Sequence, residues 1–326
     1  MIKTMKKIKV GINGFGRIGR AVCKILTDEK NIELVHINDI NPRPDNLIYL
    51  LKYDSTYGKF NKKAEIKNNK IKINNFTPKF SAHKNIDEVP WDKSNVDYII
   101  ESTGIENNVI RSKKLFENSK VKKVIVTKCS KNSDKEIIMG FNESKITKKD
   151  KIISASICDA NAAAHILNWI DKEYKIINGS LTTLHPWLTY QNLVDGTALS
   201  QSKPGVVWND FALGRSSVRS LIPKNTSAMD AVETVLPNLK NKIMSFSYRT
   251  PTDIVATLDL TLNLKTKPTH KTLVSFLKKK CNQSKYLTYN LESKVSLDYA
   301  KDTMSANIDL QWIKVNSNTV KIIAWY

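Results

Sequence analysis

Apolar and polar positions in the first half of the chain follow two patterns, one typical of buried strands and the other of helices. Short β-branched runs predict strands at residues 8–13, 32–39, 96–105 and 121–128. Helical stretches are predicted between them, at residues 20–28 and 110–119. Because strands and crossover helices alternate, the pattern predicts the α/β class and a doubly wound parallel sheet of the Rossmann type.

The turn after the first strand carries the clearest chemical signal. The stretch KVGINGFGRIGR (9–20) joins strand to helix through Gly14, Gly16 and Gly19, and Asp39 follows 20 residues after the last of these. This is the dinucleotide-binding fingerprint in the context that it requires. We expect Gly14 to permit the tight turn, Gly16 to let the backbone approach a pyrophosphate, and Gly19 to let the helix pack on the strand. The pyrophosphate then lies on the free N–H groups at the helix N-terminus.

The acid after the second strand bears on the choice of cofactor. Asp39 is expected to accept hydrogen bonds from the adenosine ribose and to repel a 2′-phosphate, which favours NAD. Arg43 lies four residues further on and could bind such a phosphate, so NADP stays possible. The alternative is a glycine-rich turn that binds no ligand.

Composition limits the classes of protein to consider. The 326 residues are 41% hydrophobic and 25% charged, which is typical of a globular chain of one large or two ordinary domains. We predict no membrane span, because no run of about 18 apolar residues occurs, and no signal peptide, because the basic start lacks an apolar core. The four cysteines lack Cys-x-x-Cys spacing, which is evidence against a metal site or a disulfide framework and favours a reducing cytoplasm.

The net charge of +21 allows two interpretations. One is affinity for nucleic acid or another polyanion. The other is a general enrichment in Lys, Asn and Ile, as an A/T-rich genome would encode. Because the lysines do not alternate with regularly spaced aromatic residues, we favour the second and expect no nucleic-acid partner.

One cysteine lies where a helix is predicted to begin. The stretch at 151–170 starts as a strand and becomes helical near Asp159, which places Cys158 at or just before the helix N-terminus. There the helix dipole and unpaired N–H groups can stabilise a thiolate and an oxyanion formed when it attacks a carbonyl. The alternative is a buried structural cysteine.

A base is needed to activate such a thiol. His185 stands at the end of a strand-like run and enters a long loop, where it could reach a cleft. His36 lies inside a predicted strand and His165 inside the predicted helix after Cys158. His83 and His270 are expected in polar loops. A structural role for His185 remains the alternative.

Taken together, these residues resemble the glyceraldehyde-3-phosphate dehydrogenase family over nearly the whole chain. Cys158 begins CDAN, where that family has Cys-x-x-Asn, and His185 follows it by the family's interval of 27 residues. Five further stretches match in order: KVGINGFGRIGR (9–20), YLLKYDSTYGKF (49–60), GRSSVRSLIPKNTSAMDAV (214–232), LPNLKNKI (236–243) and YRTPTDIVATLDLTLNL (248–264).

The resemblance implies an NAD-binding domain at residues 1–157 and an α+β catalytic domain with a mostly antiparallel sheet at 158–326. It also implies a phosphorylating aldehyde dehydrogenase of glycolysis in which Cys158 attacks as thiolate, with His185 as general base. The thiohemiacetal then passes hydride to NAD, and inorganic phosphate cleaves the resulting thioester. A small phosphorylated aldehyde is the substrate, and a homotetramer is implied, with the loop at about residues 187–219 near a neighbour's cofactor.

The resemblance extends to further site residues. It implies backbone contacts to the pyrophosphate from Arg17 and Ile18, a place near the nicotinamide for Thr127, the substrate phosphate on Arg249, and the attacking phosphate near Thr226 and Ser227.

The chain departs from the family around the nucleophile. Ile157 and Asp159 flank Cys158 where the family has Ser and Thr, and a carboxylate repels a phosphate. The acyl acceptor therefore stays open: water, or an erythrose-4-phosphate-type substrate, are alternatives. The run VKIIAWY (320–326) matches the last catalytic-domain strand, so we expect the usual closing helix to be absent. An inactive truncated relative that binds nucleotide or polyanion is the remaining alternative.

Overall fold

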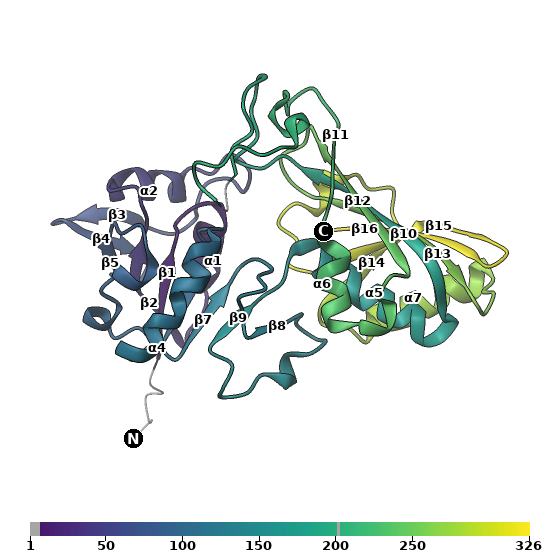
Figure 1. Cartoon of the computed structure of the whole chain (residues 1–326), viewed down its shortest axis with the longest axis horizontal. Helices are drawn as coiled ribbons and strands as arrows, with labels where there is room; N and C mark the ends of the chain where they lie inside the picture. The colour runs from purple at the N-terminus through teal and green to yellow at the C-terminus, as the bar shows by residue number, and fades with distance from the viewer. Residues whose placement is uncertain (1–6, 201–202) are drawn as a thin grey trace. The chain divides into compact units, whose positions relative to one another are not determined.

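The computed structural model describes residues 7–200 and 203–326 (Figure 1). The described chain divides into two compact units. The first contains the residues up to Glu136 together with Ile146–Ala155 and residues 203–204. The second contains Ile137–Lys145, Ser156–Ser200 and Gly205–Tyr326.

The first unit is built on a seven-stranded sheet in which every pair is parallel. Its order is β5-β2-β1-β6-β7-β9-β8, so the chain reverses direction across the sheet between β1 and β6. The strands are β1 (Ile8–Asn13), β2 (Ile32–Asn38), β5 (Lys79–Ser81), β6 (Tyr98–Glu101), β7 (Lys123–Val126), β8 (Lys135–Glu136) and β9 (Ile152–Ser154), with a separate antiparallel pair β3 (Ala64–Lys67) and β4 (Lys70–Ile73). The predicted doubly wound parallel sheet is confirmed, and such a sheet binds ligands where its strand order reverses.

The helices of this unit are α1 (Arg17–Leu26), α2 (Pro44–Lys52), α3 (Glu106–Arg111) and α4 (Leu115–Asn118). The single crossover helix predicted at 110–119 is wrong, because a 3₁₀ turn at Ser112–Lys114 separates α3 from α4. The Ser112 hydroxyl donates a hydrogen bond of 2.8 Å to the carbonyl of Asn108 four residues earlier. Such a side-chain bond competes with regular helix pairing, which fits the break at this position.

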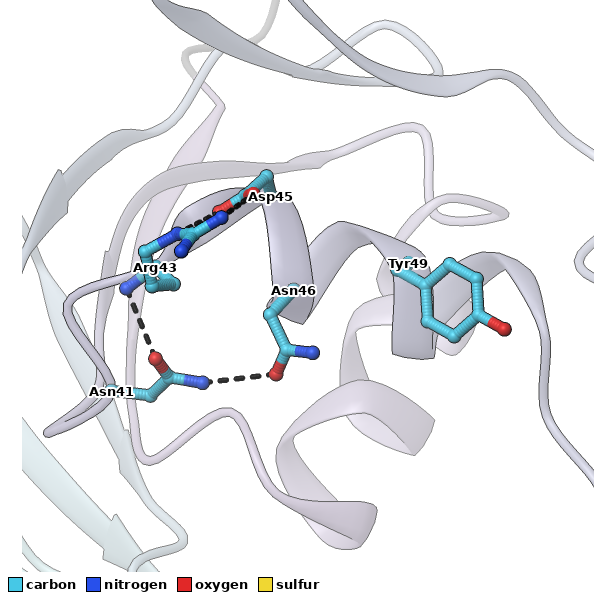
Figure 2. A pocket seen from close by; sticks show the side chains of 5 residues that line it. All are labelled: Asn41, Arg43, Asp45, Asn46 and Tyr49. Carbon is cyan, nitrogen blue, oxygen red and sulfur yellow. Dashed lines mark hydrogen bonds and ion pairs between the residues drawn. The ribbon is translucent and has the colours of Figure 1, made fainter.

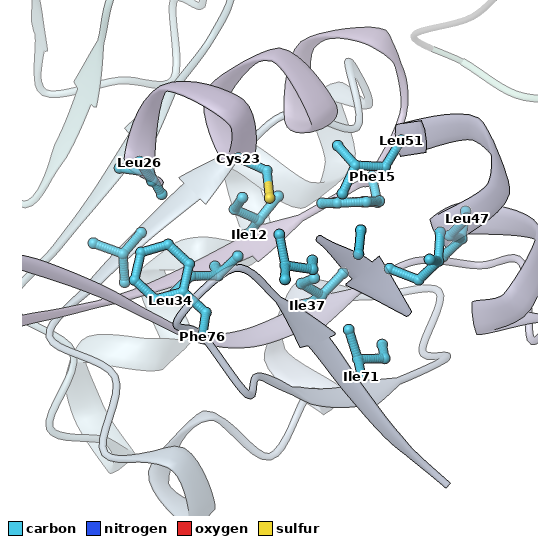
Figure 3. Packing of buried hydrophobic residues seen from close by; sticks show 14 residues of the cluster. Ile12, Phe15, Cys23, Leu26, Leu34, Ile37, Leu47, Leu51, Ile71 and Phe76 are labelled. Atoms are coloured by element: carbon cyan, nitrogen blue, oxygen red, sulfur yellow. The ribbon is translucent and has the colours of Figure 1, made fainter. Parts of the chain in front are cut away.

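The core of the first unit packs α1 and α2 against β1 and β2 (Figure 3). Ile12, Phe15 and Leu51 are fully buried there. Cys23 belongs to the same cluster, and burial raises the pKa of its thiol to about 12. This cysteine is therefore structural, and its cluster supports the turn that follows β1.

The second unit contains a mixed seven-stranded sheet of order β11-β12-β10-β13-β16-β15-β14. The β10/β12 and β14/β15 pairs are parallel and the other four are antiparallel, which confirms the predicted mostly antiparallel sheet. Its strands are β10 (Ile176–Pro186), β11 (Ile222–Lys224), β12 (Ile243–Thr250), β13 (Thr257–Leu264), β14 (Leu287–Asn290), β15 (Ala306–Asn316) and β16 (Thr319–Trp325).

The helices of the second unit are α5 (Cys158–Tyr174), α6 (Ala228–Val235) and α7 (His270–Asn282). The placement of His270 in a polar loop is wrong, because α7 begins at this residue. Thr269 caps the helix: its hydroxyl accepts from the Thr272 N–H at 3.1 Å, and the Thr272 hydroxyl accepts from the Thr269 N–H at 2.9 Å. This reciprocal capping fixes where the helix starts.

None of the helices in residues 7–200 and 203–326 combines the length and the apolar character needed to cross a bilayer.

Candidate active site

The glycine turn of the first unit has the shape that a bound pyrophosphate requires. Gly14 has a φ of +90°, and a Cβ there would lie 2.7 Å from the Thr103 nitrogen. A Cβ on Gly19 would lie 2.1 Å from the Gly14 carbonyl oxygen, so the helix can pack here only on a glycine. At Gly16, by contrast, no described atom beyond the glycine and its two chain neighbours lies within 4 Å of the Cβ position. The turn is thus crowded on its protein side and open where a phosphate would approach, which fits NAD.

Two side chains hold this turn in place. Asp39 accepts a hydrogen bond from the Phe15 N–H at 2.6 Å and another from the Asn41 N–H at 2.9 Å. Ser102, just after β6, donates to the Gly14 carbonyl at 2.7 Å. Asp39 was singled out as the ribose ligand, and the structure gives it a second task, fixing the turn. Ser102 was missed, because only the pairing of β1 with β6 brings it close.

The other predicted cofactor residues lie at the carboxyl ends of strands in the same sheet. Arg17 and Ile18 open α1, and Ile18 is 52% exposed. Thr127 follows β7, and its hydroxyl donates to the Glu101 carbonyl at 3.2 Å. Helix N-termini and strand ends at such an edge are where α/β sheets bind dinucleotides.

Arg43, the residue that kept NADP possible, is already paired. Its guanidinium donates to the Asp45 carboxylate at 3.0 and 2.6 Å. Figure 2 shows this pair at a surface pocket that Asn41, Asn46 and Tyr49 complete. Both members are exposed, so the pair is weak and solvated. A neighbouring carboxylate makes this arginine a poorer partner for a 2′-phosphate, which agrees with NAD.

In the second unit the structure brings the predicted nucleophile and base together. Cys158 is the first residue of α5, and His185 lies next to the end of β10. The Cys158 Sγ is 3.6 Å from the His185 Nε2. The His185 Nδ1 lies 2.8 Å from the Pro186 carbonyl, which can only accept, so Nδ1 carries the proton and Nε2 faces the sulfur with its lone pair.

A buried carboxylate shares this site. The Cys158 thiol donates to Asp159 Oδ1 at 3.1 Å, the Tyr326 hydroxyl donates to the same oxygen at 2.8 Å, and the Thr226 hydroxyl donates to Oδ2 at 3.2 Å. Asp159 is only 6% exposed. The sequence identified Asp159 only as a departure from the family. Tyr326 carried no signal, because its place depends on backbone pairing with Ala256.

The electrostatics of the thiol differ from the expectation for a helix N-terminus. Protein atoms crowd the thiol, although part of the residue is exposed, and this desolvation raises the pKa of Cys158 well above its ordinary value. The Asp159 charge raises it further, while Arg249 lowers it. The expected stabilisation of a thiolate is not seen in the resting site, because desolvation raises the pKa of Cys158 most and the Asp159 carboxylate, 3.1 Å from the sulfur, raises it further.

The imidazole is held neutral. Desolvation lowers the pKa of His185 and the charge of Arg249 lowers it further, whereas Asp159 raises it. A neutral imidazole facing a protonated thiol is an acid–base pair that can move one proton when the sulfur attacks.

Arg249 is a buried cation with free donors. It lies on β12, directly beside His185 in the parallel β10/β12 register, and is 8% exposed. Its Nε and Nη1 are buried and find no hydrogen-bond partner among the described residues. Unpaired buried donors on a guanidinium indicate a place for an anion.

Three further residues border this site. Thr226 accepts from the Ala228 N–H at 3.1 Å in addition to its bond to Asp159, and Ser227 is the exposed residue that precedes α6. Lys224 lies 5.1 Å from the Trp208 ring centroid and 5.8 Å from that of Tyr190, and its charge also lowers the pKa of His185. The sequence analysis missed Lys224, since its ring partners come from a distant loop.

A dinucleotide-binding fold, together with a unit that carries a paired cysteine and histidine, defines the class: this is an NAD-dependent oxidoreductase that acts on an aldehyde. Residues 8–109 match the family model described as glyceraldehyde 3-phosphate dehydrogenase, NAD binding domain, and residues 157–326 match the C-terminal domain of the same family. The chain belongs to the glyceraldehyde-3-phosphate dehydrogenase family.

Curated relatives agree along the whole length. "Glyceraldehyde-3-phosphate dehydrogenase 1" of Trichormus variabilis is 37% identical, over 99% of this chain and 92% of its own length. The enzymes named glyceraldehyde-3-phosphate dehydrogenase of Buchnera aphidicola and Schistosoma mansoni are 36% and 31% identical, over 98% and 99% of this chain and 93% of their own lengths.

Proposed function

We propose that this chain oxidises glyceraldehyde 3-phosphate with NAD, as a step of glycolysis, and passes the acyl group to inorganic phosphate. The observation that carries the proposal is the 3.6 Å approach of the Cys158 Sγ to the His185 Nε2. The family membership and the printed names of the relatives support the aldehyde and the cofactor.

The first step uses the cysteine and the histidine. As the sulfur forms its bond to the aldehyde carbon, the Cys158 proton passes to the His185 Nε2, while the Pro186 carbonyl holds the ring through Nδ1. Backbone N–H groups at the start of α5 would stabilise the oxygen that gains charge. When NAD is bound it supplies the hydride acceptor, and the acyl group is left on Cys158 as a thioester.

We assign the cofactor to the residues before Cys158 and the chemistry to those from Cys158 onward. Gly14, Gly16, Gly19, Arg17 and Ile18 would hold the pyrophosphate through backbone contacts, Asp39 the ribose, and Thr127 the nicotinamide end. The open side of Gly16 supports this assignment.

We assign the phosphate of the aldehyde to Arg249. Its unpaired buried donors would be satisfied by phosphate oxygens, and a guanidinium can bind two of them at once. We assign the attacking phosphate to the region of Thr226 and Ser227. Its oxygen would bond to the acyl carbon as the carbon–sulfur bond breaks, which returns Cys158 as thiolate.

Asp159 supports a second candidate acceptor, water. Its buried carboxylate lies beside the sulfur that bears the acyl group, where it repels phosphate and could take a proton from an attacking water. In that reaction the products are the free acid and the Cys158 thiol.

One experiment tests both candidates. The initial rate of NADH formation from glyceraldehyde 3-phosphate is measured with and without inorganic phosphate, and the product is identified as acyl phosphate or free acid. We expect the rate to depend on phosphate. A rate independent of phosphate that yields the free acid supports hydrolysis, and erythrose 4-phosphate in place of the first aldehyde tests the choice of substrate. No NADH from either aldehyde contradicts the proposed function.

We also propose a homotetramer. Several large apolar residues in or just after the loop at about 187–219 are exposed, namely Leu193 at 66%, Val194 at 75%, Phe211 at 78% and Leu221 at 64%. Apolar surface of this kind is typical of protein interfaces. Light scattering of the purified chain is expected to give four copies, and a monomer would contradict this proposal.

Finally, we propose that the enzyme works in the cytoplasm. None of the four cysteines forms a disulfide in the described chain, and a relative from Chondrus crispus, 33% identical, is named as cytosolic. Cell fractionation with an antibody to this chain tests the location.

A further inference from the structure

Cys158, Asp159 and His185 present three different metal-binding atoms to one point. The Sγ lies 3.1 Å from Asp159 Oδ1 and 3.6 Å from His185 Nε2, and these two lie 4.0 Å apart. Around a tetrahedral zinc ion, with bonds of about 2.3 Å to sulfur and about 2.0 Å to nitrogen or oxygen, neighbouring ligand atoms lie roughly 3.3–3.6 Å apart. The three atoms are therefore close to the spacing that one zinc ion imposes.

The surroundings orient these atoms as the outer shell of a metal site does. The Pro186 carbonyl holds the His185 ring so that Nε2 is free to bind, and Tyr326 and Thr226 hold the two oxygens of Asp159. Outer partners of this kind fix the direction of metal ligands and strengthen binding. They also mean that the chain need not reorganise the carboxylate and the ring to receive an ion.

The charge balance favours a divalent cation. With a thiolate on Cys158 and a carboxylate on Asp159, two negative charges lie side by side, the carboxylate buried and the cysteine partly exposed. The positive charges of Arg249 and Lys224 would repel a cation, since both lie close enough to lower the pKa of His185. They lie outside the three-atom cluster, however, whereas a bound ion contacts both anions directly.

We propose that Cys158, Asp159 and His185 together bind one zinc ion, and that this ion reversibly blocks the nucleophile. Water or a hydroxide fills the fourth position. The spacing of the cysteines led us to expect no metal site, but that rule covers only sites built from paired cysteines. Asp159 is the residue that turns a cysteine–histidine pair into a site with three protein ligands.

Binding is measured on the full chain by equilibrium dialysis against Zn²⁺ alone. We expect one saturable ion per chain, and loss of NADH formation that a chelator restores. Replacement by Co²⁺ is expected to give the charge-transfer absorption of a cobalt–thiolate bond, which reports on the wild-type protein without any substitution. The absence of this absorption, or of a saturable ion, overturns the proposal, and neither readout depends on turnover.

Substitutions locate the site. Asp159→Asn keeps the shape of the side chain and removes its charge, and we expect zinc affinity to fall at least about tenfold. The matched control is Asp230→Asn, an exposed acid in the first turn of α6, which is expected to leave the affinity unchanged. Cys158→Ser should remove the site, whereas Cys129→Ser should not.

Circular dichroism confirms that each variant is folded before its affinity is compared. Wild-type zinc affinity in folded Asp159→Asn, or loss of the ion in Cys129→Ser, contradicts the assignment.

Discussion

The cofactor turn of the first unit and the cysteine site of the second are built in different ways. The turn comes from one continuous stretch between β1 and α1, and the close approach of its backbone to neighbouring atoms requires glycine at Gly14 and Gly19. The cysteine site collects side chains from α5, β10 and β12 and from Tyr326. The geometry of a continuous turn is determined by the spacing of its own residues. The geometry of a site gathered from several elements depends on strand register and on the side chains beside it, such as Asp159.

The largest expected effect is a loss of catalysis in the second unit that leaves NAD binding by the first unit unchanged. Cys158→Ser removes the nucleophile, so we expect NADH formation to fall at least about a thousandfold. NAD affinity, measured by calorimetry, is expected to stay unchanged because the glycine turn is untouched. Full turnover in this variant contradicts the proposed chemistry.

A second prediction concerns a buried acid of the first unit. Glu101 accepts from Asn13 and from the Thr103 N–H, and burial raises its pKa to about 7. Between its ordinary value and about pH 7 the folded chain therefore holds a proton that the unfolded chain has lost. Stability contributed by this group is complete at lower pH and falls as pH rises through this window, by about 3 kcal/mol.

Urea unfolding across this pH range, followed by hydrogen exchange of the β1 and β6 amides, measures the effect. Glu101→Gln is expected to flatten the pH dependence, whereas Glu117→Gln, at an exposed position on α4, should not. An unchanged slope in Glu101→Gln argues against the assignment.

A third prediction tests the anion site of the second unit. Arg249→Lys keeps the charge and loses the planar pair of donors, so kcat/KM for glyceraldehyde 3-phosphate should fall roughly 10–100-fold. Oxidation of unphosphorylated glyceraldehyde should change little. Arg111→Lys, in an ion pair with Asp87 in the first unit, is the matched control and should leave both rates unchanged. Equal losses with both aldehydes would mean that Arg249 does not bind the phosphate.

The smallest expected effect concerns the glycine turn, where two substitutions distinguish its open side from its packed side. Gly16→Ala adds a methyl group in open space, so stability should hold while NAD affinity falls by roughly tenfold, because the methyl meets the pyrophosphate. Gly19→Ala places the same group against the Gly14 carbonyl and should lower both stability and affinity. Thermal unfolding and calorimetry separate the two, and a loss of stability in Gly16→Ala contradicts the open side of the turn.

The sequence predicted more of the first unit than of the second. The strand predicted at 8–13 has the bounds of β1, and the parallel sheet follows from the alternation of patterns. The helix expected to run unbroken through Ser112 does not, because a hydroxyl can compete for a helix carbonyl without changing the apolar pattern. The start of α7 at His270 depends on the reciprocal cap formed by Thr269 and Thr272. The polar character of this stretch predicted a loop instead.

In the second unit the sequence named candidates but not their contacts. Cys158 and His185 lie 27 residues apart, and only the packing of α5 on the sheet brings them together. Tyr326 and Lys224 reach the site through strand pairing and ring contacts that no local pattern encodes. The pKa of Cys158 is raised against expectation, first because the thiol is desolvated and second because the Asp159 charge lies beside it, and the predicted helix start indicated neither cause.

The side-by-side register of His185 and Arg249 on β10 and β12 also fixes the distance between these two residues. Neighbouring strands are spaced about 4.8 Å apart by their backbone bonds, so on the proposed assignments the sheet sets the separation between the general base and the group that binds the substrate phosphate. A substrate longer by one carbon would then have to bend to keep both ends bound, or release one of them. The proposed site would thus select substrates by chain length through the backbone hydrogen bonds of the sheet, which side-chain replacements leave in place.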